Sequence, residues 1–277
     1  MTNGQEPANN DAMNIEANDG QLTAELARRL HRALSADKGQ LYNCLQDPAP
    51  EVLRATLRNP GLREEHLLVL LKRQDLPEDL LKAIYQLDQT GASRQLKLAL
   101  VKNPATPAPI VQTLLPHLHL FELVDLCFLP SVTADQRLAA ERNILLRLES
   151  EPLGNCITLA RRGTATLVGE LLIKGEPRLM EPCLSNPRLK EAAIARFLRG
   201  PKATAETISI IARHPRWKNR PNLRQSILRH RQTPLVWFTL WLPKLPKRDL
   251  RTLLLSRQPT SAQQALINNE LKRRQKG

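Results

Sequence analysis

The chain has 277 residues, and 41 Lys and Arg against 27 Asp and Glu give it a formal net charge of +14. Only 3% of the residues are aromatic, whereas Leu, Ala and Ile are abundant, which favours aliphatic helix-on-helix packing over a β-sandwich or barrel. No apolar run reaches 18 residues and no basic, apolar leader precedes Arg28, so we expect neither a transmembrane helix nor a secretory signal, and a cytoplasmic location.

The first 20 residues are rich in Asn and Asp and hold almost no large apolar side chain. Such a segment cannot bury enough apolar surface to offset the entropy of ordering, so we predict a disordered acidic tail over 1–20. The rest of the chain, 21–277, is expected to form a single domain. Its first helix is predicted over 22–34, where Leu recurs at every fourth position.

From there the chain alternates between short helices and turns marked by proline. In the C-terminal half, successive prolines at these breaks lie 12 to 19 residues apart, so two helices make a repeat of about 26 to 30 residues. A helix of two or three turns is too short to be stable alone, so neighbouring helices must stack on one another. The clearest predicted helices are 51–57, 64–71, 78–87, 107–115, 133–148, 189–198, 204–212 and 220–228.

Two kinds of helix-start signal recur in phase with these breaks. Thr133–Gln136 and Thr260–Gln263 fit the capping box, in which Thr and Gln side chains satisfy two backbone amides reciprocally. Thr106-Pro107 and Thr233-Pro234 place a capping hydroxyl before a proline that needs no amide donor.

The segments 57–71 and 100–115 both contain an Asn-Pro turn between Leu-rich helices, and they resemble HEAT-like repeats of the leucine-rich repeat variant family. The resemblance covers most of residues 41–260, although 149–180 matches poorly. It implies an all-α, right-handed solenoid with a concave binding surface and no particular activity. One lineage of this family holds an iron–sulfur cluster in a Cys-rich N-terminal part, but only Cys44 lies there in this chain, so no cluster is expected.

The positive charge is confined to the end of the chain. Residues 21–185 are near-neutral, since residues 1–185 have a net charge of −3, whereas residues 186–277 have a net charge of +17. Between Glu206 and Asp249 there are ten Lys or Arg and no acid. A one-sided basic stretch without interleaved acids is typical of nucleic-acid binders, although a solvated face that only aids solubility has the same composition. The predicted polyanion-binding residues are Arg213, Arg216, Trp217, Lys218, Arg220, Arg224, Arg229 and Arg231.

The three tryptophans lie in this basic part. Trp217 falls in a turn among cations, where it could stack against a base. Trp237 and Trp241 are four residues apart on an apolar helix, so we expect them to pack in the core. His214 precedes a proline as Asn59 and Asn103 do, which indicates a turn residue.

No nucleotide-binding, metalloprotease or serine-hydrolase motif is present, so the sequence predicts no catalytic residue, no metal site and no cofactor. Scattered spacing argues against a disulfide framework or a zinc site, and buried thiols are the simplest expectation for Cys44, Cys127, Cys156 and Cys183.

Three functions remain open at this point. The first is a non-enzymatic scaffold whose basic C-terminal third binds nucleic acid or another polyanion. The second is a protein-interaction adaptor whose positive end docks an acidic protein surface. The third is a DNA glycosylase, since some HEAT-like solenoids use a concave-face Asp for this reaction; Asp125 or Asp249 would then be the acid.

Overall fold

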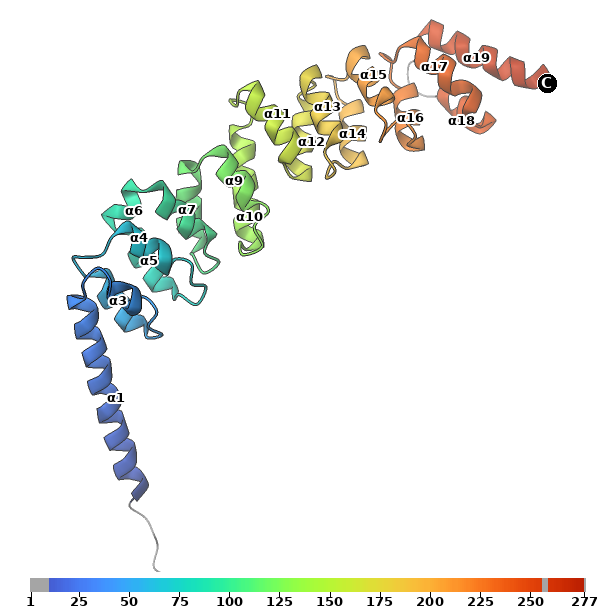
Figure 1. Cartoon of the computed structure of the whole chain (residues 1–277). Coiled ribbons are helices and arrows are strands. Elements are labelled where there is room, and N and C mark those ends of the chain that lie inside the picture. Colours follow the sequence, from blue (N-terminus) through green and yellow to red (C-terminus); the bar gives the residue numbers. More distant parts are fainter. Residues whose placement is uncertain (1–9, 256–258, 277) are drawn as a thin grey trace, which may run out of the picture. The chain divides into compact units, whose positions relative to one another are not determined.

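The computed structural model describes residues 10–255 and 259–276, and every regular element in that part of the chain is a helix (Figure 1). No strand occurs among those residues, so the all-helical prediction is confirmed for them. Most helices are two to three turns long and depend on packing against their neighbours, because so few hydrogen bonds cannot stabilise an isolated helix.

The helices group into two compact units, residues 1–143 (unit 1) and 144–277 (unit 2), where the sequence predicts one domain over 21–277. The boundary falls inside α10 (Ala134–Arg147) and not at residue 185, where the charge changes. Each unit has its own buried Leu, Ile and Val side chains.

Unit 1 begins with α1 (Asn10–Ser35), which packs on α3. This helix includes the second half of the stretch 1–20 that the sequence assigns to a disordered tail, and residues 1–9 lie outside the described residues. The other helices of unit 1 before α10 are α2 (Leu41–Cys44), α3 (Pro50–Leu57), α4 (Glu64–Leu70), α5 (Glu78–Tyr85), α6 (Asp88–Ala92), α7 (Arg94–Lys102), α8 (Ala108–Leu114), the 3-10 turn η1 (Leu115–His117) and α9 (Leu120–Leu126).

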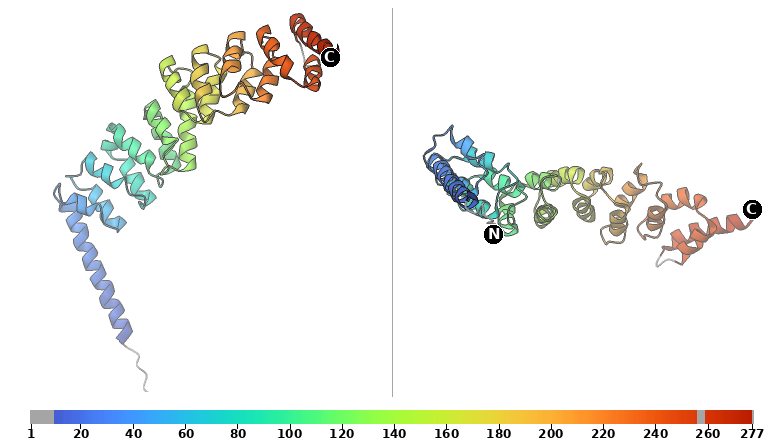
Figure 2. Two further views of the ribbon diagram at one scale, coloured as in Figure 1. Left: turned by 45° about the vertical axis from the view of Figure 1, so that its right-hand side comes forward. Right: turned by 90° about the horizontal axis from the view of Figure 1, so that it is seen from below.

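Unit 2 is a succession of short helices that alternate in direction (Figures 1 and 2). Contacts run between helices two apart in the chain, so that α11, α13 and α15 form one row and α12, α14 and α16 form another. The helices are α11 (Leu153–Arg162), α12 (Ala165–Ile173), α13 (Pro177–Ser185), α14 (Glu191–Leu198), α15 (Ala205–Arg213), α16 (Pro221–Leu228), α17 (Leu235–Trp241), the 3-10 turn η2 (Leu242–Lys244), α18 (Lys247–Leu254) and α19 (Ser261–Lys276). Three of these, α11 to α13, occupy most of the stretch whose sequence matches the repeat pattern poorly.

Buried asparagines at the Asn-Pro turns tie each turn to an earlier one. The Asn186 amide nitrogen lies 2.8 Å from the Ala160 carbonyl oxygen and 3.1 Å from that of Arg161, at the end of α11. Its side-chain oxygen accepts the Arg188 amide at 2.8 Å. Asn59 and Asn103 make equivalent bonds in unit 1, to carbonyls 23 to 32 residues earlier. The last carbonyls of a helix have no partner within the helix, so these side chains satisfy groups that would otherwise be buried unpaired.

Arginines make the same connection at other turns. Arg73 donates to the Leu45 and Asp47 carbonyls, and Arg274 of α19 donates to three carbonyls of the turn after α17. Some basic side chains therefore hold neighbouring turns together, a role that the composition alone does not distinguish from ligand binding.

Both predicted capping boxes are present. Thr133 and Gln136 exchange bonds at the start of α10, as do Thr260 and Gln263 at the start of α19. The Gln263 amide also donates to the Thr233 carbonyl, so the box holds two turns together. The predicted capping hydroxyls of Thr106 and Thr233 act differently: each donates backwards to a carbonyl of the preceding helix.

Within the described ranges, no helix combines the length and the apolar character needed to cross a lipid bilayer. The four cysteines are free, and three of them are buried. Burial raises the pKa of the Cys183 thiol to about 12 and that of Cys127 to about 12, so both are protonated at neutral pH and poor nucleophiles.

Candidate polyanion-binding surface

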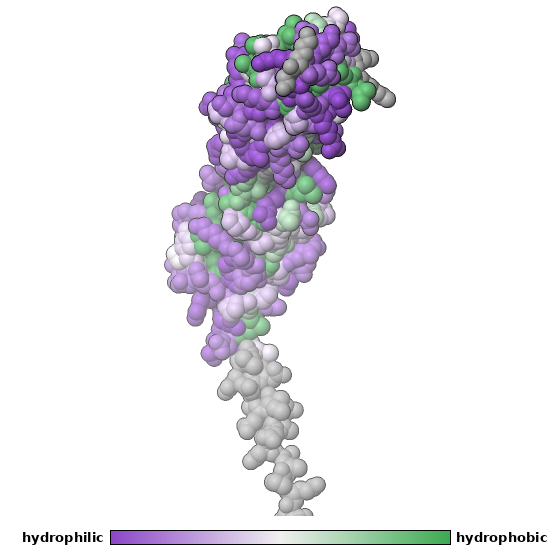
Figure 3. Space-filling view, turned by 90° about the vertical axis from the view of Figure 1, so that its right-hand side faces the viewer, coloured by the Kyte–Doolittle hydropathy of each residue, from purple (hydrophilic) through white to green (hydrophobic). Residues whose placement is uncertain are grey.

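The two units differ in charge. Unit 1 has 15 Lys and Arg against 18 Asp and Glu, whereas unit 2 has 26 against 9, a net of +17. The face of the molecule shown in Figure 3 is largely hydrophilic, with hydrophobic residues confined to small patches. An anionic partner would therefore be attracted to unit 2, and the question is where its basic side chains gather.

Turns that follow α13 and α15 lie at the same end of their helices. The Arg216 guanidinium donates from Nη1 to the Asn186 carbonyl at 2.6 Å and from Nη2 to the Pro187 carbonyl at 3.0 Å. The Trp217 indole nitrogen donates to the Leu184 carbonyl at 2.9 Å. These bonds bring the turn 214–220 directly against the turn 186–190.

Arg224 of α16 connects the same end to the turn after α17. Its Nε donates to the Lys218 carbonyl at 2.5 Å, and its Nη2 donates to Asn219 Oδ1 at 2.8 Å. Its guanidinium carbon also lies 5.6 Å from the ring centroid of Trp241, the last residue of α17. Every second turn along this part of the chain, 186–190, 214–220 and 242–246, therefore lies at this end, with the third connected through the contact of Arg224 with Trp241, the residue that precedes it.

We call the basic side chains at these three turns the basic turn surface. Arg213, Arg216 and Arg224 each donate a hydrogen bond to a backbone carbonyl, which fixes their guanidinium groups. The side chains of this surface are exposed to solvent, except that of Arg224, which is half-buried. The acids nearby are Glu181, Glu191 and Asp249, and Asp249 accepts a hydrogen bond from Gln225. The basic turn surface comprises Arg188, Lys190, Arg213, Arg216, Lys218, Arg220, Arg224, Lys244 and Lys247.

Arg229 and Arg231 lie elsewhere. They follow α16, whose eight residues span about 12 Å, and so they lie at the opposite end of the helices from Lys218 and Arg220. Arg229 and Arg231 are close to Arg220 and Arg224 in the chain, so in the sequence their charges form one stretch. Successive turns in fact alternate between the two ends, so only every second turn contributes to one surface.

Trp217 is buried, with 3% of its surface exposed, and its indole nitrogen is bonded to a carbonyl. The Arg216 guanidinium lies 4.4 Å from its ring centroid. Trp217 thus lies in a turn, as the sequence indicates, but its ring packs between two turns and is not open for a base to stack on it. The reason is that an indole can fill space and donate to a carbonyl, much as the Asn residues do at equivalent turns.

Trp237 and Trp241 pack against each other, with ring centroids 5.1 Å apart. Trp241 is buried as expected, but Trp237 is only half-buried, and its indole nitrogen donates to Ser209 Oγ at 3.1 Å. The i, i+4 spacing correctly indicates that the two rings touch. It could not show that one ring remains partly accessible.

His214 takes the place of the turn asparagine. Its Nδ1 accepts the Arg216 amide at 3.3 Å, as the Asn186 oxygen accepts the Arg188 amide. Its Nε2 therefore carries the proton and faces Ser185 Oγ at 3.4 Å and a Glu181 oxygen at 3.6 Å. Because Nε2 is protonated, it cannot accept the serine proton, so this Ser–His–Glu group is not arranged for nucleophilic catalysis.

The two carboxylates considered for a glycosylase occupy different units. Asp125 is exposed on α9 of unit 1, and Asp249 is half-buried in the first turn of α18. Asp249 Oδ2 accepts a hydrogen bond from Gln225 at 3.1 Å.

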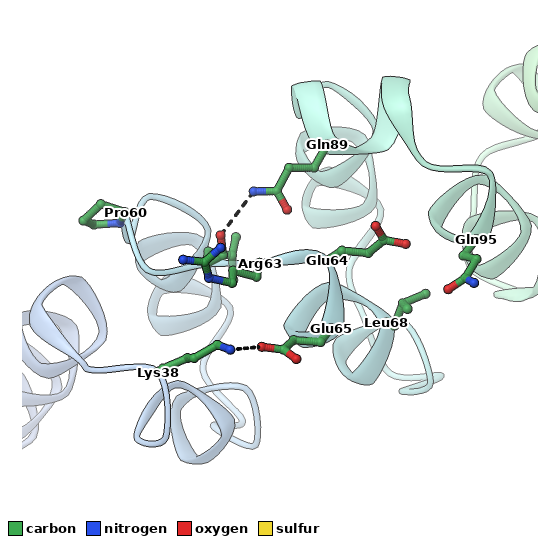
Figure 4. A pocket seen from close by; sticks show the side chains of 9 residues that line it. Lys38, Pro60, Arg63, Glu64, Glu65, Leu68, Gln89 and Gln95 are labelled. Carbon is green, nitrogen blue, oxygen red and sulfur yellow. Dashed lines mark hydrogen bonds and ion pairs between the residues drawn. The ribbon is translucent and has the colours of Figure 1, made fainter.

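A cavity of about 750 Å³ lies in unit 1 (Figure 4). Two of its four charged side chains pair with each other, since Lys38 Nζ lies 2.9 Å from a Glu65 oxygen, and Glu64 accepts a hydrogen bond from Ser93 at 2.5 Å. Gln89 donates to the Leu62 carbonyl across the cavity wall. Among the described residues, no cluster of His, Cys, Asp and Glu could hold a metal ion. Lys38 and Arg63 balance Glu64 and Glu65 in the lining, so the cavity offers no concentrated charge of one sign.

No protein-family model, no curated protein and no solved structure matches this chain. The structure alone defines the class: an all-helical protein whose C-terminal unit carries a row of basic turns.

Proposed function

We propose that this protein is a non-enzymatic α-solenoid, built of HEAT-like repeats resembling the leucine-rich repeat variant, that binds nucleic acid through the basic turn surface. The recurring bonds from Asn and Arg side chains to turns 23 to 32 residues earlier support the repeat architecture. Stacked units present equivalent positions on one surface, so basic residues at successive equivalent turns make a row.

The observation that carries this proposal is the row of nine cations on three linked turns, facing only three acids. Like charges held close together destabilise the free protein, and a polyanion relieves that repulsion while it releases its own counterions. Arg216 and Arg224 are fixed before binding, so a phosphate that contacts them does not have to order them.

The test is fluorescence anisotropy with labelled single-stranded DNA, duplex DNA and RNA across a salt series. The variant Lys218→Glu/Arg220→Glu/Lys244→Glu reverses three exposed cations that hold no other turn. We expect it to lose most binding, and the slope of log K against log salt to fall in magnitude by about 2 on a single strand, since each phosphate contact contributes about 0.7.

The matched control is Lys202→Glu/Arg229→Glu/Arg231→Glu, which makes the same charge change in the same unit at the opposite end of the helices. Its effect should be small at 0.15 M salt, where the screening length of about 8 Å is shorter than the helices. Equal loss in both variants, or no binding by the wild type at low salt, would contradict the proposal.

A second candidate function is the adaptor. Leu235, Val236 and Leu240 are 43%, 54% and 52% exposed on α17, the helix that leads into the basic turn 242–246, a combination that suits an acidic protein with an apolar anchor. Affinity purification with and without nuclease distinguishes the two. Retention of one protein after nuclease, with no nucleic acid before it, would favour the adaptor.

A further inference from the structure

Trp237 differs from Trp217 and Trp241 because its side chain is partly accessible and is also held in place by its neighbours. It is half-buried on α17, its indole nitrogen donates to Ser209 Oγ at 3.1 Å, and its ring packs 5.1 Å from that of Trp241. Two neighbours therefore fix the orientation of the ring while part of it remains accessible. A ring that is already oriented loses little conformational freedom when a planar group stacks on it.

A cation of the basic turn surface is anchored to the same residue. Arg213 Nε donates to the backbone carbonyl of Ser209 at 3.2 Å, whereas Trp237 bonds to the side chain of Ser209. Arg213 is exposed at the end of α15, next to the turn 214–220. An accessible indole and an exposed guanidinium thus lie on adjoining helices at the margin of the row of cations.

A ring beside cations suits a single strand better than a duplex. Bases in a duplex are already stacked and paired, so a duplex presents mainly its phosphates, whereas a single strand can place a base on an aromatic ring while its backbone follows the cations. Val236 and Leu240, on the same helix as Trp237, are 54% and 52% exposed and add apolar surface to α17. We propose that the accessible part of Trp237 stacks a base of single-stranded nucleic acid whose phosphates lie on the basic turn surface. The inference depends on the proposed nucleic-acid binding and adds to it the class of nucleic acid.

The experiment compares three labelled 12-nucleotide ligands: oligo-dT, the same backbone with abasic sites throughout, and a 12-base-pair duplex. An oligo-U arm distinguishes RNA from DNA. Wild type should bind oligo-dT about tenfold more tightly than the abasic strand, the size expected for one stacked base. Trp237→Ala should bring this ratio close to one, with unchanged affinity for the abasic strand and the duplex.

Two further variants separate stacking from stability. Trp237→Phe keeps a ring and loses the Ser209 bond, so it should retain part of the preference for oligo-dT. Val236→Ala changes an exposed neighbour and should retain all of it. If Trp237→Ala binds the abasic strand and duplex normally and keeps the tenfold preference, this inference is wrong and the proposed function stands. Failure of the wild type to bind all three ligands would overturn both.

Discussion

At the scale of single residues, hydrogen bonds to the backbone carbonyls of turns identify the polar side chains that stabilise the fold. Asn186 is buried and its amide reaches two carbonyls at the end of α11, while its oxygen accepts the Arg188 amide. The basic side chain of Arg216 makes comparable hydrogen bonds to turn carbonyls. A charge that looks available in the sequence can therefore already be engaged in the fold.

Asn186→Ala should lower the free energy of unfolding by about 2 kcal/mol, because it removes hydrogen bonds and leaves buried carbonyl groups without a partner. Urea unfolding followed by circular dichroism measures this. Asn222→Ala is the matched control, since Asn222 is exposed in α16 and Ala favours a helix. Equal stability of the two variants would show that the turn bonds contribute nothing.

His214 and His230 make the stability sensitive to pH. Burial lowers the pKa of His214, with Glu181 opposing the change and Arg216 adding to it, and burial likewise lowers the pKa of His230. The folded protein thus binds fewer protons than the unfolded chain, whose histidines titrate near 6.5. The stabilisation is complete above this pH and is lost as the pH falls through the folded pKa.

Melting temperatures measured between pH 7.5 and 5 should therefore fall more in the wild type than in His214→Asn/His230→Asn. Asn offers an acceptor for the amides of Arg216 and Gln232 in place of each ring nitrogen and does not titrate. Identical pH profiles would exclude these two histidines as the cause.

At the scale of elements, the turns on the second end of unit 2 are also in close contact. Gly175, between α12 and α13, has a φ of +68°, and a Cβ built there would lie 2.8 Å from the Cβ of Lys202. Only glycine suits both the left-handed backbone and the close approach of the next turn.

Gly175→Ala should lower the thermal midpoint of unit 2, since it adds roughly 1–2 kcal/mol of backbone strain as well as a clash. Gly154→Ala makes the same substitution in α11, where a Cβ meets nothing within 4 Å, and should leave the midpoint equal or higher. Differential scanning calorimetry distinguishes them. A Gly175→Ala protein as stable as the wild type would mean that the two turns can move apart.

The positions of several helices and of their caps could be predicted from the sequence. Regular apolar spacing located α14, α15 and α16 to within two residues, and the Thr–Gln pattern located two capping boxes.

The candidate site was less predictable for a geometric reason. Neighbouring turns in the chain lie at opposite ends of the helices, so Arg229 separates from Arg220, while Lys244 joins it. The exposure of Trp237 and the burial of Trp217 depend on packing between helices, which no local pattern records.

At the scale of the whole molecule, the two units divide the charge between them. Unit 1 is slightly acidic and holds the cavity shown in Figure 4, and unit 2 carries the net positive charge together with the basic turn surface. The central claim is that nucleic acid binds to unit 2 at one end of its helices, and photo-crosslinking tests it most directly.

A 20-nucleotide single strand carrying photoreactive thymine or uracil analogues would be irradiated with the full-length protein, and crosslinked peptides would be identified by mass spectrometry. We expect crosslinks in peptides that cover 213–224 and 235–247, with loss of the first set in Lys218→Glu/Arg220→Glu/Lys244→Glu. Crosslinks confined to residues 1–143, or to the turns 199–204 and 229–234 at the other end of unit 2, would contradict the account.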